Sequence, residues 1–222
     1  MGAGSGLATL DLIAGGADPV CAIEPNPVLA DRLRGAVRGS RATIEVMETA
    51  FEDTQLPQNY FDLAVAATSF HWISPAPGLA RVREVLRPGG AWAMWWNVFG
   101  DPERADPFHH ATHRLLEPLH RSPSAGENGR PPFALDVEKR TAELTWSGLS
   151  EVEHRITRWP LVLDPDGVRS LYATFSPVSR LPESERRALL DTLAGVAATQ
   201  FAGRVERNMV MIVYSAHKPE DM

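Results

Sequence analysis

The 222-residue sequence predicts an α/β fold with a doubly wound, mainly parallel sheet. Short apolar runs alternate with helix-like periodicity at intervals of about 10 to 15 residues over the first 97 positions. A turn of small residues, GAGSG, opens the first helical segment, and the next apolar run ends on Glu24. This order of turns, helices and strands is typical of repeated βαβ units.

The first 97 residues divide into expected helices and strands. Apolar residues at three- and four-residue steps predict a helix at 7–14. Asn26 is the expected cap of a second helix that begins with Pro27 and buries one face, formed by Val28, Leu29 and Leu33. A third helix is expected at 79–86. Strands are expected at 20–23, 42–46, 61–67 and 91–96. The run FDLAVAA at 61–67 is almost continuously apolar, which predicts a strand covered on both faces.

The alternation breaks after Asn97. Residues 103–135 predict a helix rich in His and Leu, followed by the loop-like sequence SPSAGENGRPPF. The rest of the chain predicts a strand, two helices and a final strand, at 152–163, 168–172, 183–201 and 208–215.

Composition narrows the class of protein. A net charge of -6 gives no general attraction to nucleic acid or anionic lipid, so neither is an expected partner. Cys21 is the single cysteine, which fits a reducing compartment. No apolar run approaches the ~20 residues of a membrane span, and the first residues do not resemble a secretory signal. We therefore expect a cytoplasmic protein, whose oligomeric state the sequence does not predict.

The glycine turn and Glu24 together predict a cofactor site. Small residues let backbone N–H groups approach a ligand closely, and the following helix adds a favourable dipole. A carboxylate about 20 residues further on, at the end of the next strand, suits the hydroxyls of a ribose. The alternative for the glycine motif is a glycine-rich turn that binds no ligand, and the alternative for Glu24 is a carboxylate that caps a helix or lies on the surface. The joint pattern favours an adenosine-type cofactor.

Four motifs in order resemble those of class I S-adenosylmethionine-dependent methyltransferases: GAGSG, AIEPNP, FEDTQLPQNYFDLAVAATSFHW and REVLRPGGAWAMWWN. The similarity is greatest to the small-molecule group that includes trans-aconitate and quinone-biosynthesis methyltransferases. The later stretch LYATFSPVSRLPESERRALL is similar to the accessory region of the same group. The resemblance implies S-adenosylmethionine as cofactor and a small-molecule methyl acceptor, with the reacting atom (O, N or C) left open.

The resemblance also assigns cofactor contacts. Gly2, Ala3, Gly4 and Gly6 would surround the amino-acid end of the cofactor, and Glu24 would bind its ribose. Pro25 would flank the adenine, with Ala50 contacting it through the backbone and Phe51 packing on the ring. Ala67 and Thr68, at the end of the 61–67 strand, would face the methionine part.

The expected substrate pocket is formed by Phe70, His71, Trp72 and Asn97. His71 is a candidate to orient the substrate or to take a proton, since its reference pKa lies near neutrality. The alternative is a loop histidine that hydrogen-bonds backbone. Phe70 and Trp72 would face the cationic sulfur, or else pack between helix and sheet. His109 and His113 have helical metal-ligand spacing, but no matching carboxylate or cysteine accompanies them, so we expect no metal.

The resemblance implies a domain plan and a sheet order of 3-2-1-4-5-7-6. Residues 1–97 would be the cofactor-binding core, 98–135 a helical cap that carries substrate specificity, and 136–222 the C-terminal part of the same domain, with strands six and seven. The apolar run of strand one, which should precede the glycine turn, is missing. We expect the recorded start to lie inside a longer reading frame. A catalytically silent cofactor-binding or scaffold protein and a nicotinamide oxidoreductase are the competing hypotheses.

Overall fold

The computed structural model of the protein describes residues 1–119 and 131–220. The chain forms two compact units, the first made of Met1–Trp96, Asp136–Arg155 and Val213–Met222. The second unit is made of Asn97–Leu135 and Ile156–Ile212. The grouping differs from the expected plan, because most of the expected C-terminal part joins the segment that follows Asn97. None of the described helices is long and apolar enough to cross a membrane.

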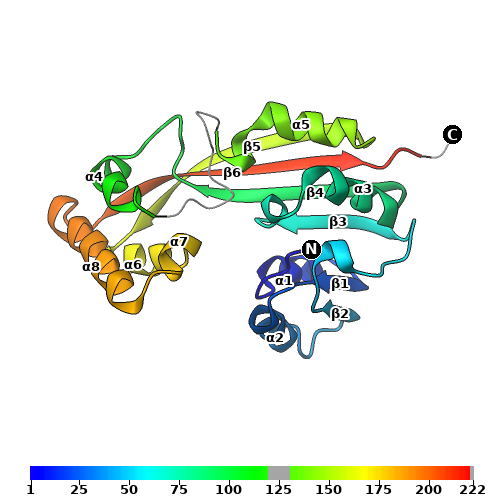
Figure 1. The fold of residues 1–222 in the computed structure, drawn as a ribbon, viewed down its shortest axis with the longest axis horizontal. Coiled ribbons are helices and arrows are strands. Elements are labelled where there is room, and N and C mark those ends of the chain that lie inside the picture. The colour runs from blue at the N-terminus through cyan, green and yellow to red at the C-terminus, as the bar shows by residue number, and fades with distance from the viewer. Residues whose placement is uncertain (120–130, 221–222) are drawn as a thin grey trace. The chain divides into compact units, whose positions relative to one another are not determined.

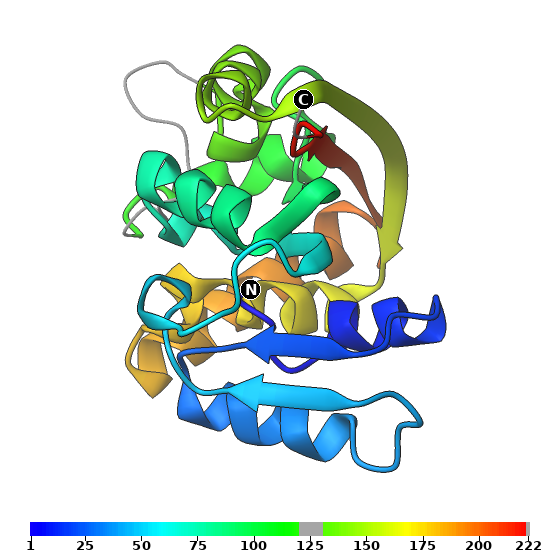
Figure 2. The same cartoon turned by 90° about the vertical axis from the view of Figure 1, so that its right-hand side faces the viewer.

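The first unit begins with two helices and two paired strands (Figure 1). In chain order these are α1 (Leu7–Ala14), β1 (Val20–Ile23), α2 (Pro27–Ala36) and β2 (Ile44–Met47). The strands β1 and β2 pair in parallel from Val20↔Ile44 to Ile23↔Met47, and Figure 2 shows both arrows pointing the same way.

Asn26 begins α2 as predicted, because its side chain accepts hydrogen bonds from the backbone N–H groups of Val28 and Leu29. The expected apolar face of this helix is only partly right. Leu33 is fully buried, but Val28 is 61% exposed. Five residues separate the two, which places them about 140° apart around the helix. Ala30, one turn from Leu33, takes the buried place instead.

The second half of the N-terminal segment contains η1 (Phe51–Asp53), β3 (Phe61–Ala67), η2 (Phe70–Trp72), α3 (Pro75–Val85) and β4 (Leu86–Phe99). The strands β3 and β4 pair in parallel, with Leu63↔Ala91 and Ala67↔Trp95 in register. The prediction that 61–67 is covered on both faces is wrong, because Leu63 is 44% exposed. In the described sheet β3 is an edge strand with β4 as its neighbour.

The remaining elements are α4 (Pro107–Leu116), η3 (Phe133–Leu135), α5 (Val137–Trp146), β5 (Ser150–Leu163), α6 (Pro165–Ala173), α7 (Ser176–Ser179), α8 (Glu183–Gln200) and β6 (Val205–His217). The larger sheet has the order β3-β4-β6-β5. Near the start of β4, the backbone N–H of Gly89 donates to Lys218 O, and that of Lys218 donates to Gly90 O. The beginning of β4 therefore lies beside the end of β6, and these two strands run antiparallel. The expected loop SPSAGENGRPPF falls mainly on 120–130, outside the described residues.

The second unit packs α4, α6 and α8 around an apolar cluster, formed by Phe108, Val168, Tyr172, Val178, Leu190, Leu193, Ala197 and Val205. Asp106 begins α4 by accepting from the backbone N–H of His109 at 2.7 Å. The same carboxylate pairs with Nε of Arg207 at 2.8 Å, and both side chains are almost fully buried. This paired charge fixes the start of α4, four residues later than the sequence predicts.

The first residues of the chain lie between the two sheets of the first unit. The amino group of Met1 donates to Val65 O on β3, at 2.9 Å. The backbone N–H of Ala3 donates to Ile23 O on β1, at 3.0 Å. Among the described residues β1 and β3 belong to separate sheets, and these contacts link the two strands.

Candidate functional site

The glycine turn is held in a conformation that favours glycine. Gly2, Gly4 and Gly6 have φ values of 61°, 58° and 101°. A Cβ on Gly2 would lie 2.3 Å from Cβ of Ser69, and one on Gly6 would lie 2.7 Å from Cδ1 of Leu33. A Cβ on Gly4 would have nothing within 4 Å. Gly2 and Gly6 therefore allow close packing, whereas Gly4 borders open space.

Glu24 holds the glycine turn to the end of β1. Its side chain is 5% exposed. Oε2 accepts from the backbone N–H of Gly4 at 2.8 Å, and Oε1 accepts from that of Asn26 at 3.0 Å. The structure thus brings together the two features from which the cofactor site was predicted. Each carboxylate oxygen has a further lone pair that can accept a ligand hydroxyl.

The predicted adenine contacts follow the carboxyl ends of the two parallel strands. The backbone N–H of Glu24 donates to Met47 O, which ties those strand ends together. Pro25 is exposed after β1, and Ala50 is half-buried after β2. Phe51 is buried in η1. Ligands of open α/β sheets bind outside such strand ends. The contacts of these residues with adenine stay predictions.

The end of β3 turns sharply beside the glycine turn. Ala67 closes the strand, and Thr68 has a φ of 52°, an uncommon conformation for a β-branched residue. The backbone N–H of Thr68 donates to Trp95 O at 2.7 Å. Ser69 Oγ donates to Met1 O at 3.0 Å. Strain of this kind costs on the order of 1–3 kcal/mol and is typical of functional sites.

The structure separates the two aromatic residues of the predicted pocket. Phe70 is 1% exposed, and its ring packs edge-on against Trp92 with centroids 5.3 Å apart. Phe70 is therefore a core residue, which corrects its assignment to the pocket. Trp72 is 54% exposed, with its ring centroid 5.3 Å from that of His71. The role of Trp72 as a pocket residue stays a prediction.

His71 lies in η2 with one ring nitrogen engaged. Nε1 of Trp96 on β4 donates to Nδ1 of His71 at 3.0 Å. Burial lowers the pKa of His71 to about 4, so the ring is neutral at pH 7. Sequence reasoning missed this role of Trp96. The signal was present, because Trp92 and Trp96 have the even spacing that puts side chains on one face of a strand.

The other predicted site residues lie in the second unit. Asn97 is its first residue and stays a predicted pocket residue. The rings of His109 and His113 are stacked 6.0 Å apart on α4. Burial, with the charge of Arg207, lowers the pKa of His109. In residues 1–119 and 131–220, no group of three or more His, Cys, Asp or Glu side chains is placed to hold a metal ion.

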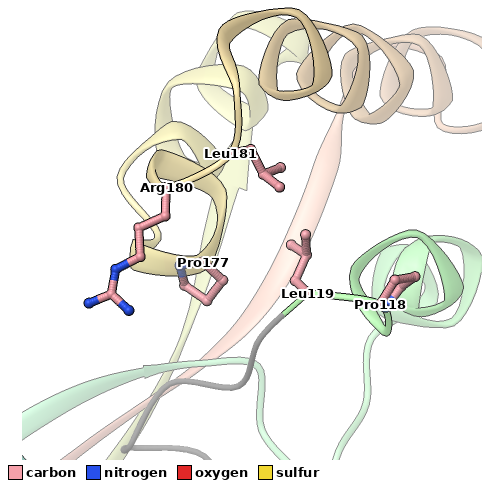
Figure 3. Close-up of a pocket in the computed structure, with 5 residues that line it drawn as sticks. All are labelled: Pro118, Leu119, Pro177, Arg180 and Leu181. Atoms are coloured by element: carbon pink, nitrogen blue, oxygen red, sulfur yellow. The ribbon is translucent and has the colours of Figure 1, made fainter.

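A surface hollow of about 270 Å³ lies in the second unit (Figure 3). The residues that line it are Pro118, Leu119, Pro177, Arg180 and Leu181. It is mostly apolar, with one exposed cation at its side, and all of its lining residues belong to the second unit.

Comparison with known proteins relates the N-terminal part of the chain to a methyltransferase family. Residues 1–94 match the methyltransferase domain family. An uncharacterized methyltransferase of Mycobacterium tuberculosis is 38% identical over 98 residues, which cover 44% of this chain and 38% of that protein. The match to this family covers residues 1–94, which are less than half of the chain.

The similarity extends beyond the first unit's N-terminal segment. An uncharacterized methyltransferase of Schizosaccharomyces pombe is 24% identical over 224 residues, 98% of this chain and 82% of that protein. The fold resembles phosphoethanolamine N-methyltransferase 2 of Haemonchus contortus, solved with S-adenosylhomocysteine and phosphomonomethylethanolamine. The TM-score is 0.57 at 13% identity, over 99% of this chain and 48% of the other. The match to the mycobacterial relative spans well under half of that protein's length.

Proposed function

We propose that this protein is a methyltransferase that binds S-adenosylmethionine at the glycine turn and transfers its methyl group to a small molecule. The observation that carries the proposal is the 2.8 Å bond from the Gly4 N–H to the Glu24 carboxylate. This bond joins the glycine turn, which has open space beside Gly4, to the buried carboxylate of Glu24. The backbone N–H groups of the turn and the carboxylate oxygens suit an adenosine cofactor. The match of residues 1–94 to the methyltransferase domain family and the S-adenosylhomocysteine complex of the Haemonchus enzyme support this proposal.

In such a reaction the cofactor supplies a methyl group on a cationic sulfur: the acceptor's lone pair forms the new bond to carbon, and the electrons of the broken bond stay on sulfur. The chain's own contribution is alignment and exclusion of water. Glu24 would hold the ribose hydroxyls, and the glycine turn would accept the amino-acid end closely. Trp72 would border the acceptor. A carboxylate acceptor needs no base, because no proton leaves it.

Calorimetry with S-adenosylhomocysteine and with NAD tests the proposal. We expect binding of S-adenosylhomocysteine and none of NAD. Binding of NAD alone would favour the oxidoreductase hypothesis, and binding of neither compound would contradict the proposal. Release of S-adenosylhomocysteine from S-adenosylmethionine, measured against a panel of small metabolites, then identifies the acceptor. Cofactor binding with no turnover on any acceptor would favour the silent or scaffold hypothesis.

A further inference from the structure

The short turn η1 is closed by Thr54, the residue that follows it. Thr54 is 3% exposed, and its Oγ1 donates to Phe51 O at 2.7 Å. Its backbone N–H donates to the same carbonyl at 3.3 Å, and the N–H of Asp53 donates to Ala50 O at 3.1 Å. These bonds close the turn that carries the buried side chain of Phe51. The conformation of η1 therefore depends on where Thr54 is held.

Helix α3 holds Thr54 through Arg81. Nη2 of Arg81 donates to Thr54 O, and Nη1 donates to Oε2 of Glu84 at 3.0 Å. The Arg81 side chain is 23% exposed, and its Nε is buried without an acceptor among the residues that the structure describes. A buried donor without an acceptor is unfavourable, so the bonds of the other two nitrogens must outweigh this cost. A guanidinium suits this place because it can reach two acceptors at once.

Glu84 extends the contact to the far end of the same loop. Its Oε1 accepts from Nε2 of Gln58 at 2.6 Å, and its backbone O accepts from the N–H of Asn59 at 3.0 Å. Arg81 and Glu84 lie on one side of α3, because residues three apart are neighbours on a helix surface. The ion pair between them therefore joins the two ends of the loop that leads from η1 to β3.

Arg83 provides a comparison on the same helix. It lies two residues after Arg81, about 200° around the helix. Its Nη1 donates to Ser147 O at 3.3 Å, which is a contact with the segment after α5. A substitution at Arg83 therefore removes the same charge from α3 without removing a bond to η1.

We propose that Arg81 is a positioning residue which, together with Glu84, holds η1 in the conformation that accepts the adenine base of the cofactor. The adenine part of this inference rests on the proposed function, in which Ala50 and Phe51 contact that base. Arg81 acts through Thr54 rather than by touching the ligand. It keeps the turn in its binding conformation before the ligand arrives, so binding does not have to order the turn.

Amide hydrogen exchange of the ligand-free protein tests the hold on η1. We expect the amides of Asp53 and Thr54 to exchange about tenfold faster in Arg81→Met than in the wild type, because the bonds that close η1 open more often. Arg83→Met should leave both amides at the wild-type rate. Glu84→Gln is a milder change to the same contact, should give an intermediate rate, and covers the case in which Arg81→Met does not fold. Equal exchange in the wild type and Glu84→Gln would overturn the proposal.

Calorimetry with S-adenosylhomocysteine, well below the melting temperature of each variant, tests the consequence for the cofactor. If about a tenth of the Arg81→Met molecules hold η1 in the binding conformation, the Kd rises about tenfold. Arg81→Lys keeps a donor for Thr54 O and should recover part of the affinity, whereas Arg83→Met should bind as the wild type does. A Kd within twofold of the wild type in Arg81→Met, with faster exchange in η1, would refute the link between the turn and the cofactor.

Adenosine alone identifies the affected end of the cofactor. Its affinity should fall in Arg81→Met by the same factor as that of S-adenosylhomocysteine, because both compounds carry the base. An unchanged affinity for adenosine would contradict the assignment of η1 to adenine. A wild type that binds neither compound would contradict the proposed function and the adenine part with it, whereas the exchange rates of Asp53 and Thr54 still decide whether Arg81 holds the turn.

Discussion

Replacing Glu24 with Gln tests the cofactor site with the smallest change of shape. The wild-type carboxylate accepts hydrogen bonds from two backbone N–H groups, one on each oxygen, at 2.8 and 3.0 Å. A glutamine keeps one accepting oxygen and presents an NH₂ to the other N–H, which then loses its partner. A hydrogen bond to a charged group contributes about 1.5–3 kcal/mol. Glu24→Gln should therefore destabilise the fold by that amount and lower the melting temperature by roughly 3–12 °C.

The same substitution should weaken cofactor binding, because the ribose hydroxyls lose a charged acceptor. A loss of about 1.5–3 kcal/mol corresponds to a 10- to 150-fold increase in Kd for S-adenosylhomocysteine. Isothermal titration calorimetry measures the Kd, and thermal denaturation without ligand measures stability. The matched control is Glu45→Gln, which makes the same charge change at an exposed position of the adjacent strand. A Kd within twofold of the wild type in Glu24→Gln would remove Glu24 from the site.

Three further predictions concern the turn, the second unit and pH. Gly2→Ala should lower the melting temperature far more than Gly4→Ala, because a Cβ on Gly2 would lie 2.3 Å from Cβ of Ser69, whereas a Cβ on Gly4 would have nothing within 4 Å. Equal falls in melting temperature would show that Gly2 is not needed for close packing. Asp106→Ala leaves Arg207 buried and unpaired, and chemical denaturation should show a loss of about 3–5 kcal/mol. The folded-state pKa of His71, about 4, lies below its unfolded value of 6.5, so stability should fall as pH drops from about 6.5 to about 4, by at most about 3 kcal/mol. A His71→Gln variant with the same pH dependence of stability as the wild type would contradict this.

The elements that the sequence predicts best are those whose apolar pattern, capping residue or glycine motif lies within a few neighbouring residues. Helix α1, strand β1 and strand β3 begin and end at the predicted residues. The start of α2 is predicted by two residues: Asn26 caps the helix, and the fixed φ of Pro27 suits its first position. The glycine turn and Glu24 are also short-range patterns with a known spacing.

The features that sequence reasoning missed depend on distant contacts. Helix α5 was not predicted, because it buries only Arg140 and Leu144, four residues apart, and shows little apolar periodicity. The exposure of Leu63 follows from the position of β3 at the edge of its sheet, which no local pattern encodes. The bond between Trp96 and His71 joins residues 25 positions apart on different elements. Phe70 was expected in the pocket because it closely follows the strand at 61–67. Only the fold shows that its ring packs against Trp92.

The most direct test of the central claim is an experimental structure of the chain with S-adenosylhomocysteine. The account predicts that the ribose hydroxyls lie within hydrogen-bond distance of the Glu24 carboxylate and that the amino-acid end lies against Gly4. The adenine should lie near Pro25 and Ala50. A ligand bound away from the glycine turn, or with its ribose held by another side chain, would contradict the account.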